Sequence, residues 1–76
     1  MEELLEILNE LHPEVDFENA NDLIDSHIID SFDIVAIISE VGDRFDVTIS
    51  AEYITPENFN SAENLWNLIE RLEEEG

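Results

Sequence analysis

Apolar residues recur at helical spacing in three stretches of this sequence, and no stretch alternates apolar and polar residues as a half-buried strand does. The spacing predicts helices over residues 2–11, 31–45 and 61–74, the first of which ends before Pro13. The inward stripes of these helices are, in chain order, Leu4, Leu8 and Leu11; Ile34, Ile37, Ile38, Val41 and Phe45; and Ala62, Leu65, Ile69 and Leu72. Helical stripes must bury their apolar side against one another, so the pattern predicts an all-α fold.

Two further segments complete the expected architecture. Residues 12–30 have no sustained period, although scattered apolar residues suggest that this segment is pinned across the core. A connection of this length is uncommon in a compact domain and is usually functional. Within residues 50–59, Ser50 could cap one turn, and Thr55 before Pro56 is a favourable start for another. We therefore expect a four-helix bundle: three main helices and one short helix, with a long loop between the first two.

A chain of 76 residues is expected to form one domain, 1–76, with little room for a deep pocket beside its core. A domain of this size buries only about 60% of the surface that its unfolded chain exposes. We expect the core to include Leu8, Ile38, Val41, Phe45, Leu65, Ile69 and Leu72, with Trp66 at its edge. A shaped substrate pocket needs more residues than a chain of this length can supply beside its core, so we expect that the chain is not itself an enzyme.

The charge balance restricts the possible partners. The sequence has 21 acidic residues against two basic ones, a formal net charge of −19. Phosphates of nucleic acids and anionic membrane surfaces would repel such a chain, whereas basic patches on other proteins would attract it. The first residues lack the basic region of a secretory signal, and no apolar run approaches a membrane span. We expect a cytoplasmic monomer with no membrane insertion.

The sequence gives little support to two other functions, nucleophilic catalysis and calcium binding. Ser31 with Asp30 and the two histidines, His12 and His27, has the residue types of a nucleophilic triad, but no Gly-x-Ser-x-Gly turn surrounds the serine. The acidic segment 43–48 lacks the glycine and the ligand alternation of a calcium loop, and the absence of cysteine excludes thiolate ligands. Loose divalent-ion buffering stays open, but we expect no dedicated metal site.

The tetrapeptide Asp30-Ser31-Phe32-Asp33 is the most informative short motif. Ser31 stands where the N-cap of the second helix is expected, at the end of a long irregular loop, so its hydroxyl should be accessible. A helix N-terminus has a positive partial charge and free backbone N–H groups, which suit a phosphodiester attached there. Phe32 projects about 160° away from Ile34 on the helix, which predicts an exposed aromatic side chain beside the serine. Taken alone, the motif could also be an ordinary helix cap.

The sequence resembles the acyl carrier protein superfamily, including D-alanyl and peptidyl carriers, over nearly its full length. The family signature is Asp-Ser followed by Leu, Met or Phe at the start of the second of four helices, and Ile29-Asp30-Ser31-Phe32-Asp33 matches it. The similarity continues over residues 34–45, 46–49 and 55–59 and in the last helix from Ser61. Length, acidity, helix order and spacing agree with this resemblance.

The resemblance implies a function for named residues. Ser31 would receive 4′-phosphopantetheine from coenzyme A through a separate, magnesium-dependent phosphopantetheinyl transferase, and the arm would hold acyl or aminoacyl groups as thioesters. The other partners would be a loading ligase and a downstream transferase with basic docking patches. Positions matching the family's recognition surface are Asp30, Phe32, Asp33, Ala36, Glu40 and Asp43.

Two departures bear on the pathway. Fatty-acid carriers usually have Gly-Ala before Asp-Ser-Leu, where this chain has Ile28-Ile29, and commonly have an acid where this chain has Ala36. The form found here is closer to stand-alone carriers of D-alanine transfer, peptide assembly or specialised polyketide and polysaccharide pathways. The alternative from another class is an unmodified acidic helical interaction module that uses Phe32 and the same acidic face only for binding.

Overall fold

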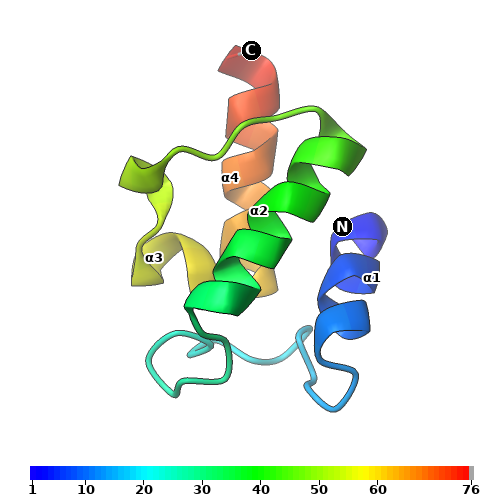
Figure 1. Ribbon diagram of the computed structural model, residues 1–76, viewed down its shortest axis with the longest axis vertical. Helices are drawn as coiled ribbons and strands as arrows, with labels where there is room; N and C mark the ends of the chain where they lie inside the picture. Colours follow the sequence, from blue (N-terminus) through cyan, green and yellow to red (C-terminus); the bar gives the residue numbers. More distant parts are fainter. Residues whose placement is uncertain (76) are drawn as a thin grey trace.

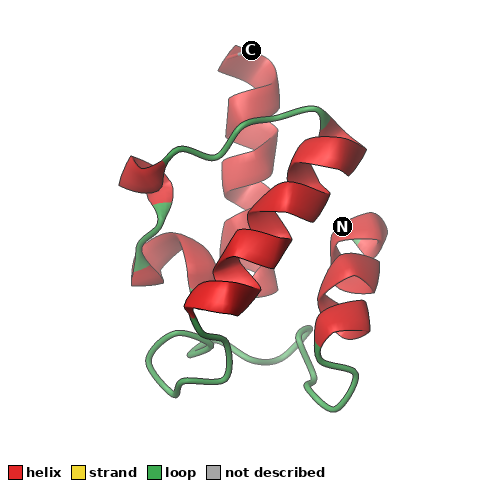
Figure 2. Cartoon of the chain, in the orientation of Figure 1, coloured by secondary structure: helices red, strands yellow, loops and turns green. Residues whose placement is uncertain are grey.

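Four α-helices and one 3-10 turn account for the regular structure of this chain, and a computed structural model describes residues 1–75. The elements are, in order, α1 (Glu2–Leu11), α2 (Ser31–Phe45), the 3-10 helix η1 (Ala51–Tyr53), α3 (Pro56–Phe59) and α4 (Ala62–Glu75). Figure 1 shows α1 on one side of α2, η1 and α3 on the other, and the long loop passing beneath the bundle. Only helices and loops are present in the described range (Figure 2), which confirms the predicted all-α fold with three main helices and one short helix.

The core lies where α1 packs against α2 and α4, and where α3 closes onto α4. Of the predicted core, Leu8, Val41, Leu65 and Ile69 are buried. The other three predicted core residues, Ile38, Phe45 and Leu72, pack against this core but are half-buried at its edge. The buried stripe of α1 differs from the predicted one only at Ile7 and Leu11. Leu4, Ile7 and Leu8 are buried, whereas Leu11 is half-buried.

The long loop, residues 12–30, is pinned across the core as predicted. Phe17, Leu23 and Ile29 are buried in it, each from a different part of the loop. Asn60, between α3 and α4, holds the middle of the loop from a distant part of the sequence. Its backbone oxygen accepts a hydrogen bond from the N–H of Leu23 at 3.0 Å, and its side-chain oxygen accepts one from the N–H of Ile24 at 2.9 Å. These contacts give the loop a defined path up to the start of α2.

Helix ends in the second half of the chain show which capping predictions were correct. Ser61 caps α4, since its hydroxyl accepts a hydrogen bond from the N–H of Asn64 at 3.0 Å. Ser50 and Thr55 take the predicted N-cap positions of η1 and α3, but neither side chain makes a capping hydrogen bond. Pro56 occupies the first position of α3, where its missing N–H costs nothing.

The α1–α2 contact includes one of the two arginines. The Arg44 guanidinium lies 3.5 Å from a carboxylate oxygen of Glu6 and 3.9 Å from one of Glu10. Both glutamates are exposed, so each pair contributes less than about 1 kcal/mol to the free energy of unfolding. Within residues 1–75, no helix combines the length and the apolar character required to cross a membrane.

Candidate functional site at the start of helix α2

Asp30, not Ser31, is the N-cap of α2, and this corrects the sequence prediction by one position. The Asp30 carboxylate accepts a hydrogen bond from the N–H of Asp33 at 3.1 Å, and the Asp33 carboxylate accepts one from the N–H of Asp30, also at 3.1 Å. This reciprocal arrangement is a capping box, built here from two aspartates. Two negative side chains at a helix N-terminus also interact favourably with the helix dipole.

Ser31 is therefore the first residue of the helix, and its side chain is released from any capping role. The residue is exposed, and within residues 1–75 its hydroxyl takes part in no side-chain hydrogen bond. The capping box satisfies the N–H of Asp33, and the N–H of Ile34 is bonded to the Asp30 carbonyl at 2.9 Å. The N–H groups of Ser31 and Phe32 remain at the end of the helix, beside the hydroxyl.

The chain immediately before the site is fixed by a tight backbone loop. The carbonyl of Leu23 accepts hydrogen bonds from the N–H groups of Ile28, at 2.9 Å, and Ile29, at 3.1 Å. Ile29 is itself buried, while His27 turns the chain with a left-handed backbone (φ 57°). Because the buried Ile29 directly precedes the N-cap, the backbone at the capping box and Ser31 is held in place.

His12 contacts this site, and the sequence analysis did not foresee it. Its Nε2 lies 2.8 Å from a carboxylate oxygen of Asp33, and its Nδ1 lies 3.1 Å from one of Glu14. These hydrogen bonds, first the one to Asp33 and then the one to Glu14, raise the pKa of His12. Burial acts to raise the pKa of Asp33, but hydrogen bonds from His12 and from the Asp30 backbone outweigh it and lower that pKa. The contact joins the end of α1 to the start of α2.

The residues predicted for partner recognition differ in their exposure and in their existing hydrogen bonds. Phe32 is 86% exposed, as predicted, and Asp30 and Asp43 are exposed, whereas Ala36 and Glu40 are half-buried. Asp33 is half-buried, and its carboxylate is already bound by the cap and by His12. It is therefore a structural group of the site more than a free docking contact.

Val35 is a further exposed apolar residue that the sequence analysis missed. It is 66% exposed and follows Phe32 by three positions, so both side chains lie on the same side of α2. That spacing was the signal that could have identified it. Phe32 and Val35 together form a small apolar patch beside Ser31.

The geometry of the site does not support a catalytic triad at Ser31 or a metal site. Both ring nitrogens of His12 face carboxylates, so neither is directed at the Ser31 hydroxyl. His27 is exposed in the loop that precedes the site. In the part of the chain that the structure describes, no group of three or more histidine, aspartate or glutamate side chains is arranged to hold a metal ion.

Comparison with known proteins does not assign the site. No protein-family model matches this chain, and no curated protein matches it significantly. The helical fold and the geometry around Ser31 are therefore the observations on which a function can be argued.

Proposed function

We propose that this chain is a carrier protein that holds acyl or aminoacyl groups on a 4′-phosphopantetheine arm attached to Ser31. The observation that supports the proposal most directly is the state of Ser31 itself. Its hydroxyl is exposed at the first position of α2, while Asp30 performs the capping that the serine could have performed. A serine with no structural task at this position is available for modification.

The surroundings of Ser31 suit a phosphodiester. The N–H groups of Ser31 and Phe32 open at the helix N-terminus, where backbone dipoles favour a negative group. Attachment would form a bond between Ser31 Oγ and the phosphorus that bears pantetheine. The bond from that phosphorus to the nucleotide half of coenzyme A would break, and the serine proton would pass to a base of the transferase. The attached arm would supply a thiol, which this cysteine-free chain lacks.

The partners proposed for such a carrier are a phosphopantetheinyl transferase, a loading ligase and a downstream transferase with basic docking patches. Two features of the surface favour them. The net charge of −19 attracts basic surfaces at long range and accelerates association. The patch formed by Phe32 and Val35 offers an apolar contact beside the arm. A small contact surface suits partners that must also release the carrier quickly.

The test is enzymatic loading followed by intact-mass measurement. The purified chain is incubated with coenzyme A, magnesium and a broad-specificity phosphopantetheinyl transferase, and the mass should rise by one phosphopantetheine. Ser31→Ala should abolish the gain. Ser39→Ala, at another exposed serine of the same helix, is the matched control and should load like the parent chain.

Two results would contradict the proposal. Loading of the Ser31→Ala variant would show that the attachment site is elsewhere. Failure of several transferases on a chain that circular dichroism shows to be folded would favour the other class of function. In that case the exposed Phe32 and Val35 would serve an unmodified acidic interaction module.

A further inference from the structure

A second surface lies at the opposite end of α2 from Ser31. Two open hollows, of about 570 and 590 Å³, adjoin the C-terminal end of α2, and both are lined by Phe45 and Glu73. We call the two together the distal groove. Helix α2 has 15 residues, so about 20 Å of helix separates Ser31 from this groove.

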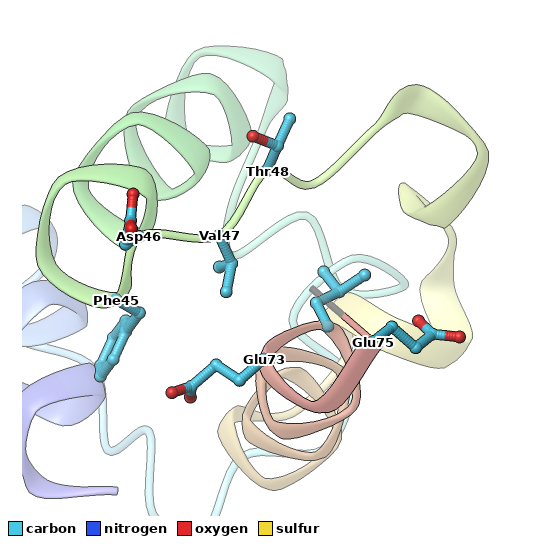
Figure 3. Close-up of a pocket in the computed structure, with 7 residues that line it drawn as sticks. Phe45, Asp46, Val47, Thr48, Glu73 and Glu75 are labelled. Carbon is cyan, nitrogen blue, oxygen red and sulfur yellow. The ribbon is translucent and has the colours of Figure 1, made fainter.

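The floor of the distal groove is apolar and includes an aromatic pair. The rings of Phe45 and Trp66 pack edge to face with centroids 5.5 Å apart, and both residues are only half-buried. Val47 and Leu72 extend the apolar floor in the first hollow. In Figure 3 the Glu73 side chain extends toward Phe45, and the Val47 side chain points into the space between α2 and α4.

The rim of the distal groove is predominantly acidic. Its acidic residues come from both ends of the chain and from the turn after α2: Glu2, Glu3, Asp46, Glu70, Glu73 and Glu75. Neither hollow has an arginine among its lining residues in the described part of the chain. Arg44, at the end of α2, is directed toward Glu6 and Glu10 on α1. The α-amino group of Met1, which lines the second hollow, is one positive group there, so the six carboxylates are only partly neutralised by the described part of the chain.

We infer that the distal groove binds a basic amphipathic segment of another protein, with an apolar side chain on the Phe45–Trp66 floor and lysine or arginine side chains on the rim. An acidic rim around a half-buried aromatic floor is complementary to that combination of charge and apolar surface. A second copy of this chain would bring like charge, and so would an anionic membrane. Such a partner would hold the chain from the end away from Ser31.

The distance from Ser31 gives this surface a separate role. A segment bound about 20 Å away along α2 would leave Ser31, Phe32 and Val35 uncovered. One partner could thus retain the chain while a second one works at the start of α2. The inference does not depend on the arm, because every residue of the distal groove lies outside the proposed attachment site.

Trp66 supplies the readout for a binding experiment because it is the only tryptophan and lines the distal groove. The probe is a synthetic amphipathic helix of leucine, alanine and lysine, titrated into the unmodified chain at an ionic strength of about 0.15 M. A lysine–serine peptide of equal charge is the polar comparison. We expect saturable binding of the amphipathic peptide, a change in Trp66 emission, and amide shifts concentrated in residues 45–48 and 70–75. The polar peptide should bind more weakly.

A charge-matched pair of double variants separates local binding from general attraction. Glu70→Gln with Glu73→Gln removes two rim charges, whereas Glu52→Gln with Glu57→Gln removes two exposed charges outside the groove. The rim variant should weaken the amphipathic peptide about threefold to tenfold relative to the control variant. Equal weakening by both variants, or equal binding of the polar peptide, would overturn the inference. Loading of Ser31 is measured separately, so failure here leaves the proposed function standing.

Discussion

Replacing His12 by glutamine should remove a pH-dependent part of the stability, because His12 links the end of α1 to the cap of α2 through Asp33. Its two ring nitrogens lie 2.8 Å from Asp33 and 3.1 Å from Glu14, an arrangement in which both donate only when the imidazole is protonated. Glutamine can still donate a hydrogen bond in this position, but it has no charge. The comparison therefore isolates the ionised form of the contact.

The size of the effect follows from how exposed the pair is. A hydrogen bond to a charged group contributes about 1.5–3 kcal/mol when sheltered, and a fully exposed ion pair contributes less than about 1 kcal/mol. The side chains of His12 and Asp33 are 25% and 20% exposed, which places them between these limits. We expect His12→Gln to lower the free energy of unfolding by about 1 kcal/mol at pH 5.5, equivalent to about 4–8 °C in Tm for a domain of this size.

The direction of the pH dependence follows from the two pKa shifts. The pKa of His12 is raised in the folded chain, so its contribution is complete below its unfolded pKa of about 6.5 and is lost as the pH rises through the folded value. The pKa of Asp33 is lowered, so its contribution is present above about pH 4 and is lost as the pH falls through the folded value. The contact is therefore strongest between about pH 4 and 6.5.

Urea unfolding at a series of pH values, followed by far-ultraviolet circular dichroism, measures this directly. The difference between the parent chain and His12→Gln should be largest near pH 5.5 and fall to a few tenths of a kcal/mol by pH 8.5. The matched control is His27→Asn. It removes the other histidine, and asparagine tolerates the left-handed backbone there. A difference that is constant with pH, or one that grows above pH 7, would refute the reasoning.

Three further predictions concern stability. Asp30→Ala should lower the free energy of unfolding by about 1 kcal/mol, because Asp30 caps α2. Ser31→Ala should change that free energy by less than about 0.5 kcal/mol. The reverse order of the two variants in urea unfolding would contradict the observed cap. Gly42→Ala should stabilise the chain by about 0.5–1 kcal/mol, because alanine has a higher helix propensity than glycine. The new Cβ would lie 3.5 Å from the Val47 carbonyl oxygen, which is an ordinary contact distance. A loss of stability would contradict this prediction. Thermal melts should shift upward with added sodium chloride, because the net charge of −19 is self-repelling, and a flat series would contradict this.

The charge of the chain has opposite effects on stability and on binding. Self-repulsion lowers the stability of the fold, and few internal cations offset it, Arg44 between α1 and α2 being one. The same charge would attract the basic partners proposed for the two ends of α2. At the Ser31 end the small apolar patch follows the exposed Asp30, and in the distal groove acidic residues line the hollow that contains Phe45 and Trp66. Two separate surfaces of one small helical bundle would then use the same long-range attraction.

Much of the architecture was predictable because its causes are local. Helical spacing of apolar residues is a property of a short segment, so the bounds of α1 and α2 and the capping of α4 by Ser61 were all predicted. The exposure of Phe32 followed from the same helical geometry. The cap of α2 was missed by one residue because Asp30 and Ser31 are both good N-caps, and only the reciprocal bonds with Asp33 decide between them.

Other features required the tertiary structure because they join residues that are far apart in the sequence. His12 meets Asp33 across 21 positions, and Asn60 binds the loop at Ile24 across 36 positions; no periodicity in the sequence encodes either contact. The distal groove arises only when the beginning of α1, the end of α2 and the end of α4 come together. Local spacing thus determined the helices and the exposed serine motif, whereas packing decided which charged groups are paired, and it left Ser31 without a structural partner among the described residues.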